Sequence, residues 1–481
     1  MSDSVPWLDW STSAFEQAAT RNVPIFLSLV TCWSEECRVM DRTAFANPDV
    51  VAFVSSQFVP VRVDGDRRPD INERYTLGGW PTTAFLTPER EVLSGATYLA
   101  ADQLLGLARR VADAWRDRAA DIRERSLLKR AARKENAGVA HGAADLASVD
   151  RLRALLVTEF DRRNGGFGTA PKVPHAAALH LLLSLLTTED RADAADLAVI
   201  IETTLDKMWA LWDRERGGFR RFAESADWTD PASEKTLEDN AALLHVYIEA
   251  AARRGTEDLA DRVAQIAGWV RTNLTDAVDG TFYNALSEHH VDRSMYVDRN
   301  AAMAAAFLRA GVVLNDRRVR DFGLKSLEEV ILSAYVPGSG VAHTSDGAVR
   351  GLLADQVAVA SAAIWGHVIT EQLPFPMLAA ELMQFALRTM WDESARALRD
   401  RIAIDDPVHP FQLNCEAACV LDRLATITGD PMFRDRSLAI LGSLAAEYPR
   451  HGLFGASYAL AVREIVERQR PVGLELGKVE W

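Results

Sequence analysis

The sequence predicts two units of different fold class: an α/β domain followed by an all-α ring of six helical hairpins. Two observations carry this prediction. In roughly the first 120 residues, short apolar strand patterns alternate with helical patterns, as they do in α/β folds. Beyond residue 147 the pattern is almost entirely helical, and a glycine-rich turn returns about every 50 to 65 residues, which indicates a repeat architecture.

The composition is that of a globular protein with room for two or three domains, since 48% of the 481 residues are hydrophobic and 25% are charged. A net charge of -14 argues against nucleic acid or an anionic membrane as partner, because both attract clustered Lys and Arg. We find no leader-like segment and no apolar stretch of membrane-spanning length, so we expect a cytoplasmic protein. Four cysteines do not make a disulfide framework, which agrees with a reducing compartment.

The α/β unit begins with a helix that Ser11 or Thr12 caps. The continuously apolar stretch 23–30 follows as a buried strand, and 58–63 is a second strand after an intervening helix. Because strand and helix pairs joined by short connections are typical of parallel sheets, we expect a parallel core.

The turn after the first strand resembles the thioredoxin-type pattern W-C-x-x-C-[RK]-x-M. Trp33 and Cys37 take their expected places, but Ser34 stands at the position of the attacking cysteine. Further on, Pro81 follows a glycine turn, and in a thioredoxin fold this proline would be cis and would face the active-site turn. Ser34, Cys37, Cys32 and Pro81 together make up a candidate redox turn.

Three segments extend this resemblance: PIFLSLVTCWSEECRVM, VRVDGDRRPDI and GGWPTTAFLTPE. They are similar to the thioredoxin-like-plus-toroid family that includes spermatogenesis-associated protein 20 and many bacterial homologues. On this alignment the family's first cysteine is Ser34, its second is Cys37, and the following histidine is Arg38. The resemblance implies a thioredoxin-like fold followed by an (α/α)6 toroid, the fold of six-hairpin glycosidases and sugar 2-epimerases.

The serine has a chemical consequence, because dithiol enzymes attack through an exposed first thiolate at a helix amino terminus. A hydroxyl cannot do this. Cys37 takes the resolving position beside the acidic Glu35 and Glu36, which disfavour a thiolate. Cys32 would pair with Cys37 only if the loop were rebuilt, and the alternative is that both are reduced and pack as small apolar groups. We therefore do not expect dithiol activity.

The predicted domain boundaries are 1–118 for the thioredoxin-like domain, 119–146 for a helical linker and 147–481 for the toroid. A long charged helix crosses the first boundary, and a Gly/Ala-rich stretch precedes the second. Within the toroid, alanine-rich helices suit an inner ring, since they pack closely on both sides, and amphipathic helices suit an outer ring. Twelve helices in six hairpins result.

Two stretches of the toroid, 165–175 and 217–243, resemble the family's most distinctive segments and supply the candidate site. Paired carboxylates can act as acid and base at a sugar bond. The catalytic candidates are Glu234, Glu238 and Asp239. The candidates for ligand binding are Lys172, His175, Arg221, Trp228, Lys235 and Asn240.

A structural role stays open for several of these residues. Asp239 and Asn240 recur as polar openers of other inner helices, where they would satisfy backbone groups. Two histidines of the family pattern are Arg220 and Ala232 here, which weakens a catalytic reading because histidine is the usual proton-transfer residue at neutral pH. Two further histidines also flank expected inner helices and are weaker candidates for the cavity wall: His343 and His409.

The leading hypothesis is a two-domain protein whose toroid binds, and in one variant processes, a small polar or carbohydrate ligand. A rival hypothesis is a thiol-disulfide oxidoreductase that uses Cys37 with or without Cys32. A third is a binding or scaffold protein without chemistry. We expect no cofactor and no metal, because Cys415 and Cys419 share a helical face without further ligands at suitable spacing. The oligomeric state is not predicted.

Overall fold

The computed structural model describes residues 4–136, 142–186, 194–402 and 407–467. The chain divides into two compact units, Met1–Gly138 and Val139–Trp481. Among the residues described, no helix is both long and apolar enough to cross a bilayer. The linker boundaries expected from the sequence stay a prediction, because a single helix, α5 (Ala101–Asn136), covers much of that region.

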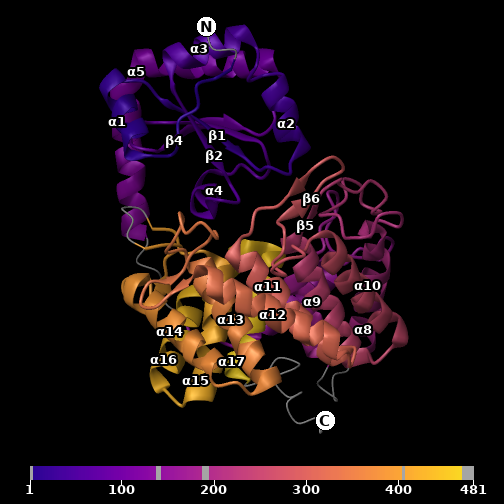
Figure 1. The fold of residues 1–481 in the computed structure, drawn as a ribbon. Coiled ribbons are helices and arrows are strands. Elements are labelled where there is room, and N and C mark those ends of the chain that lie inside the picture. The colour runs from indigo at the N-terminus through magenta and orange to yellow at the C-terminus, as the bar shows by residue number, and fades with distance from the viewer. Residues whose placement is uncertain (1–3, 137–141, 187–193, 403–406, 468–481) are drawn as a thin grey trace. The chain divides into compact units, whose positions relative to one another are not determined.

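The first unit is a four-stranded sheet with helices on both faces (Figure 1). The strands are β1 (Ile25–Val30), β2 (Val59–Asp64), β3 (Thr82–Leu86) and β4 (Val92–Ala96), in the order β2-β1-β3-β4. The helices are α1 (Thr12–Arg21), α2 (Glu35–Arg42), α3 (Pro48–Gln57), α4 (Pro69–Tyr75) and α5. Ser11 caps α1 by accepting a hydrogen bond from the backbone N–H of Ala14, which confirms the predicted cap.

Strand β1 is buried on both faces, which explains its unbroken apolar sequence. On one face Phe26 packs with Phe58 and Phe85 under α2, α3 and α5. On the other face Leu27 packs with residues of α1 and α4. The sheet therefore separates two apolar clusters and forms the middle of three layers.

The expected parallel core is wrong for two of the three strand pairs. Only β1 and β2 pair in parallel, whereas β3 runs antiparallel to β1 and β4 antiparallel to β3. The connection through α4, a helix of seven residues, does not cross the sheet. The chain enters β3 at the edge where β2 ends, and Thr82 pairs with Leu29 there.

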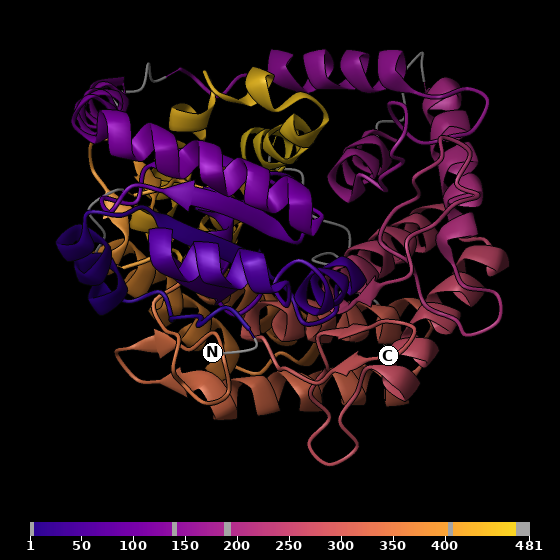
Figure 2. The same cartoon turned by 90° about the horizontal axis from the view of Figure 1, so that it is seen from above.

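The second unit is a closed ring of helices, as predicted. Its inner helices are α7 (Ala176–Leu185), α9 (Leu237–Arg254), α11 (Val297–Val313), α13 (Leu353–Thr370), α15 (Phe411–Thr428) and α17 (Ala456–Val466). Each inner helix contacts the next, and α17 contacts α7, so the six close on themselves. The outer helices are α6 (Ala147–Glu159), α8 (Ala194–Met208), α10 (Glu257–Asn273), α12 (Arg317–Ala334), α14 (Pro374–Thr389) and α16 (Pro431–Leu444). Figure 2 shows these helices following one another around the ring in chain order.

The glycine-rich turns before the inner helices have a steric cause. Gly218 has a φ of +84°, and a Cβ atom there would lie 2.3 Å from Cζ2 of Trp269. Only glycine allows this left-handed backbone to lie against the indole. Very short strands lie before or after some of these turns, namely β5 (Lys235–Thr236), β6 (Ala285–Leu286), β7 (Val291–Asp292), β8 (Tyr335–Val336), β9 (Gly340–Val341), β10 (Trp391–Asp392) and β11 (Ala397–Leu398).

Candidate functional site

The predicted redox turn is present, but its thiols are poorly placed for exchange chemistry. Ser34 is the N-cap of α2, and its Oγ accepts a hydrogen bond from the N–H of Cys37 at 3.3 Å. Cys37 is only 3% exposed, and burial raises the pKa of its thiol. Cys32 is exposed, and its Sγ donates to Oδ2 of Asp64 at 3.2 Å. The Trp80–Pro81 bond is cis, as expected.

The predicted toroid candidates mostly hold the glycine-rich turns. Lys172 is fully buried, and its Nζ contacts Oδ2 of Asp161 at 2.9 Å and the carbonyl of Gly168 at 2.8 Å. Lys235 repeats this arrangement one turn later, with Oδ2 of Asp213 at 2.8 Å and the carbonyl of Gly217 at 2.6 Å. Each lysine therefore links the aspartate and the glycine carbonyl of a glycine-rich turn to the chain segment that follows the turn.

Asn240 is also occupied within the protein. Its Oδ1 accepts from the N–H of Phe219 at 2.9 Å, and its Nδ2 donates to the carbonyls of Phe219 and Thr236. We call this set of hydrogen bonds between an amide side chain and the turn backbone a clamp. The clamp recurs at the fourth residue of three other inner helices, through Asn300, Gln356 and Asn414. The clamp ties each glycine-rich turn to its inner helix, which is the structural alternative left open for Asn240 by the sequence.

The remaining candidates lie around the same helix start. Trp228 is 1% exposed and donates from its indole N–H to the carbonyl of Asn164 at 3.0 Å. Asp239 accepts from the hydroxyl of Thr236 and lies 3.5 Å from Nε of Arg221. Two more are placed nearby: Glu234 is buried, and Glu238 is exposed at 3.4 Å from Arg299. None of these side chains lines the central cavity described next, so their assigned roles stay predictions without support from its geometry.

A cavity of about 580 Å³ lies inside the helical ring. All six inner helices contribute to its wall. Of the ligand-binding candidates predicted from the sequence, His175, at the start of α7, lines the cavity. The Glu, Arg and His side chains of the wall, apart from His175, are His180, His245, Glu249, Arg253, Arg309, Glu416, Arg423, Arg463 and Glu464. A volume in the range of about 300–1,000 Å³ is typical of small-ligand pockets.

Glu416, on α15, is the distinctive group of this wall. Its side chain is exposed to the cavity, and the inner helices enclose the cavity around it. Burial, together with the negative charges of Glu238 and Asp298, raises the pKa of Glu416 to about 7. Within the described ranges, no group hydrogen-bonds or ion-pairs with this carboxylate. Such a group is half protonated near neutral pH and can both give and take a proton.

A second acid-base pair lies on α7 and α9. Nδ1 of His180 is 2.6 Å from Oε2 of Glu249. With its proton on Nδ1, the ring donates to this carboxylate, and the other ring nitrogen, Nε2, can accept a proton. Burial opposes ionisation of Glu249, but His180 and Arg253 outweigh it and lower the pKa of Glu249 to about 2. Glu249 therefore stays ionised and orients the imidazole of His180, whose ring lines the cavity.

His245 has a different role, because both of its ring nitrogens are occupied. Nε2 lies 3.1 Å from the carbonyl of Ala302, and Nδ1 lies 2.9 Å from Nη1 of Arg309. A carbonyl accepts and a guanidinium donates, so the ring is the neutral Nε2–H tautomer. Burial, followed by the charge of Arg309, lowers the pKa of His245 to about 3. His245 thus holds Arg309, and its one ring N–H donates to the carbonyl of Ala302.

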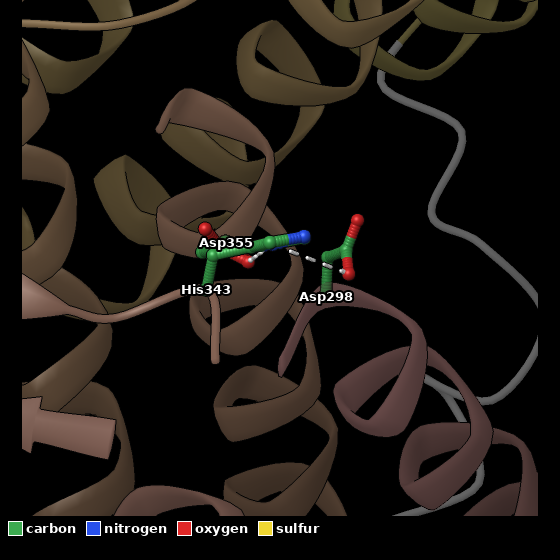
Figure 3. A group of neighbouring side chains, drawn as sticks. All are labelled: Asp298, His343 and Asp355. Carbon is green, nitrogen blue, oxygen red and sulfur yellow. Dashed lines mark hydrogen bonds and ion pairs between the residues drawn. The ribbon is translucent and has the colours of Figure 1, made fainter. Parts of the chain in front are cut away.

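Figure 3 shows a second group at the start of the inner helices, formed by Asp298, His343 and Asp355. Nδ1 of His343 is 2.9 Å from Oδ1 of Asp355 and 3.9 Å from Oδ1 of Asp298. Burial raises the pKa of Asp355 to about 6. These residue types could hold a divalent cation, and the sequence did not predict the group.

The repeats give this group a structural explanation. In three consecutive repeats, a side chain of the turn contacts a side chain of the inner helix. The turn residue lies two places after the one whose backbone the clamp binds, and the helix residue lies just before the clamping Asn or Gln. The pairs are Arg221 with Asp239, Asn284 with Arg299, and His343 with Asp355. The third histidine that the sequence placed near an inner helix, His409, instead contacts Asp392. The His343–Asp355 contact is therefore one form of a latch that fastens each turn to its inner helix.

Comparisons with known proteins agree with this description. Residues 1–131 match the family Thioredox_DsbH, described as a protein of unknown function, DUF255. Human spermatogenesis-associated protein 20 is 30% identical over 308 residues, which are 58% of this chain and 38% of that protein. An uncharacterised Caenorhabditis elegans protein is 26% identical over 367 residues, covering 71% of this chain and 49% of its own length. These matches make the chain similar to spermatogenesis-associated protein 20 and to proteins that share its first domain. The chain spans about half or less of the length of these curated relatives.

Solved structures show which fold the family's second domain has here. A sugar epimerase from a ruminal bacterium superposes with a TM-score of 0.57 at 12% identity, over 67% of this chain and all of that one. A D-mannose isomerase gives 0.58 at 12% identity over 67% and 97%. A family 76 glycoside hydrolase of Bacteroides thetaiotaomicron gives 0.51 at 10% identity over 67% and 100%. Likeness at this level of identity establishes the toroid fold alone.

Sequence reasoning missed the cavity residues, although a signal for them exists. Glu416, His180 and Arg309 are isolated ionisable residues within alanine- or leucine-rich stretches such as CEAAC, ALHLLL and AAAFLRA. Other helices flank an inner-ring helix on both sides, so a charged side chain on it is expected to point into the central cavity. Motif comparison favoured the turns because the family resemblance is densest there.

The raised pKa of Glu416 gives a stability prediction. Between about pH 4.5 and 7 the folded state keeps a proton that the unfolded chain has released, so stability falls as pH rises through this window. We expect Glu416→Gln to be more stable than the wild type, with an advantage that grows by about 1 kcal/mol from pH 6 to pH 8.5 after allowance for cavity water. Urea denaturation at both pH values measures this, and a constant difference would contradict it.

Proposed function

We propose that the toroid is a proton-transfer enzyme that acts on a small sugar-like ligand in the central cavity. The observation that carries the proposal is the carboxylate of Glu416, which pairs with no group among the described residues and has a pKa of about 7, on the wall of a 580 Å³ cavity. Glu416 would give or take a proton near neutral pH. Nε2 of His180, oriented by Glu249, would serve as the second proton carrier.

The state of the other carboxylates favours isomerisation or epimerisation over hydrolysis. Canonical glycoside hydrolysis needs two working carboxyl groups, one acid and one base or nucleophile. Glu249 is tied to His180 and Arg253, and Glu464 to Arg423 at 2.6 Å. One free carboxylate and one oriented imidazole instead suit removal and return of a proton beside a sugar carbonyl. Related folds named sugar epimerase and D-mannose isomerase support the same ligand class.

The test is solvent-deuterium exchange. The full chain would be incubated in D2O with a panel of aldoses and ketoses, and deuterium at the carbon beside the carbonyl would be followed by NMR. We expect incorporation with at least one sugar, and a loss of about 100-fold or more in Glu416→Gln. The control is Glu393→Gln, which removes a carboxylate that is 80% exposed. No exchange with any sugar, or full exchange in Glu416→Gln, would refute the proposal.

The redox hypothesis has less support from the geometry. Burial raises the pKa of Cys37, and Ser34 places a hydroxyl at the position that needs a thiolate. The scaffold hypothesis predicts that no saturable ligand is found. A thermal-shift screen of the same sugars separates binding from chemistry, because Glu416→Gln would keep binding while losing exchange.

A further inference from the structure

The two ends of the cavity wall differ in how far the protein already uses their polar groups. Toward the ends of the inner helices, ion pairs occupy the wall. Arg423 lies 2.6 Å from Glu464, and Arg253 lies 2.9 Å from Glu249. The charges at this end are therefore compensated within the protein.

The wall near the starts of the inner helices has polar side chains that a ligand can use. Gln412, in the first turn of α15, and Ser457, in the first turn of α17, both line the cavity. Among the described residues, neither side chain has a hydrogen-bond partner. An amide and a hydroxyl can each donate and accept. Gln412 precedes Glu416 by one helical turn on the same face of α15, about 6 Å along the helix axis.

An exposed aromatic ring lies beside these polar groups. Phe454, two residues before α17, lines the cavity and is 51% exposed. Among the exposed large hydrophobic side chains of the described residues, Tyr98 is also aromatic, but it belongs to the first unit. The ring of Phe454 packs against the imidazole of His175, with centroids 5.3 Å apart and planes at 57°. His175 thus supports one side of the ring, and the exposed part is available to a ligand.

A pyranose ring matches this combination of groups. One of its faces carries C–H bonds, which are attracted to the negative face of an aromatic ring. Its edge carries hydroxyls, which bind amides and other hydroxyls. A sugar that reacts at Glu416 lies about one helical turn inside Gln412. The groups at the rim would therefore contact a second sugar ring joined to the first.

We infer that the natural ligand is a disaccharide or longer oligosaccharide, whose reducing-end residue reacts at Glu416 and whose next residue stacks on Phe454 and hydrogen-bonds to Gln412 and Ser457. This inference rests on the proposed function and names its substrate class. Proton transfer beside a carbonyl requires a free carbonyl group, and an oligosaccharide has one only at its reducing end. The rest of the ligand must then extend toward the rim.

The test compares each monosaccharide with disaccharides that carry it at the reducing end, by isothermal titration calorimetry on the full chain. Glucose would be set against cellobiose and maltose, and mannose against β-1,4-mannobiose. We expect at least one disaccharide to bind about 10- to 100-fold more tightly than its monosaccharide, through stacking and added hydrogen bonds. Because these ligands are neutral, the affinity ratio should change little with salt.

Variants assign the ratio to individual side chains. Phe454→Ala should lower it by about 5-fold or more, whereas Phe454→Trp should keep it, since an indole also offers an aromatic face. Gln412→Ala tests the inference from a different helix and should lower the ratio by about 3- to 10-fold. The matched control is Tyr98→Ala, which removes an aromatic side chain that is 43% exposed in the first unit and should leave the ratio as in the wild type.

The outcomes separate this inference from the proposed function. If no disaccharide binds more tightly than its monosaccharide, or if the ratio is unchanged in Phe454→Ala, the inference is overturned. Deuterium exchange into a monosaccharide that Glu416→Gln abolishes would then still support the proposed function. Saturable binding by no sugar at all overturns both.

Discussion

Replacing Asn240 by leucine is expected to lower the free energy of unfolding of the toroid by about 3–5 kcal/mol. The substitution keeps a side chain that branches at Cγ but enlarges it, and it removes three hydrogen bonds, two of them to the backbone of Phe219. Both groups are buried, and each buried polar group left without a partner costs about 1–3 kcal/mol. The loss should open the contact between the glycine-rich turn and α9.

Urea denaturation followed by tryptophan fluorescence measures this effect. The matched control is Asn273→Leu, because Asn273 is exposed and makes one hydrogen bond, from Nδ2 to the carbonyl of Trp269 at 3.0 Å. The control should cost below about 1 kcal/mol. A small loss in Asn240→Leu, combined with weakened sugar binding, would instead favour the ligand-binding role first predicted for Asn240.

The second large effect is a gain of function. We expect Ser34→Cys to form a disulfide with Cys37 and to give the first unit a dithiol activity that we do not expect of the wild type. Ser34 occupies the N-cap of α2, where the helix dipole favours a thiolate, and its Oγ already lies 3.3 Å from the N–H of Cys37. A cysteine at this position would complete the W-C-x-x-C pattern with Trp33 and Cys37.

Mass spectrometry after mild oxidation detects the disulfide, and an insulin-reduction assay measures turnover. The double variant Ser34→Cys with Cys37→Ser should lose both signals, and Ser34→Ala should match the wild type. The opposite finding, robust insulin reduction by the wild type that Cys37→Ala abolishes, would restore the redox hypothesis. Reversible pairing of Cys32 with Cys37 in the wild type would do the same.

The sequence predicted the fold well because its signals are local. The apolar run of β1, the cap at Ser11 and the recurring glycine turns each depend on residues close together in the chain. The direction of β3 was missed because it depends on the reach of the seven-residue helix α4, which strand and helix patterns do not encode.

The candidate site was predicted only in part. The turn residues around Lys235 were recognised by family resemblance, and the structure gives them ion pairs and clamps that hold the ring together. His175 alone among them lines the cavity. Resemblance marks residues that the fold needs as readily as residues that a ligand needs, so it could not separate the two.

By itself, the sequence determined two units, a serine in place of a reactive cysteine and a ring of repeated hairpins, because each of these is written in consecutive residues. Only the tertiary structure decided that Glu416, His180 and Arg309 share one cavity. They come from three helices far apart in the chain, and ring closure brings them together. Their charges are adjusted by burial and by each other, and both depend on distances that exist only in the folded ring.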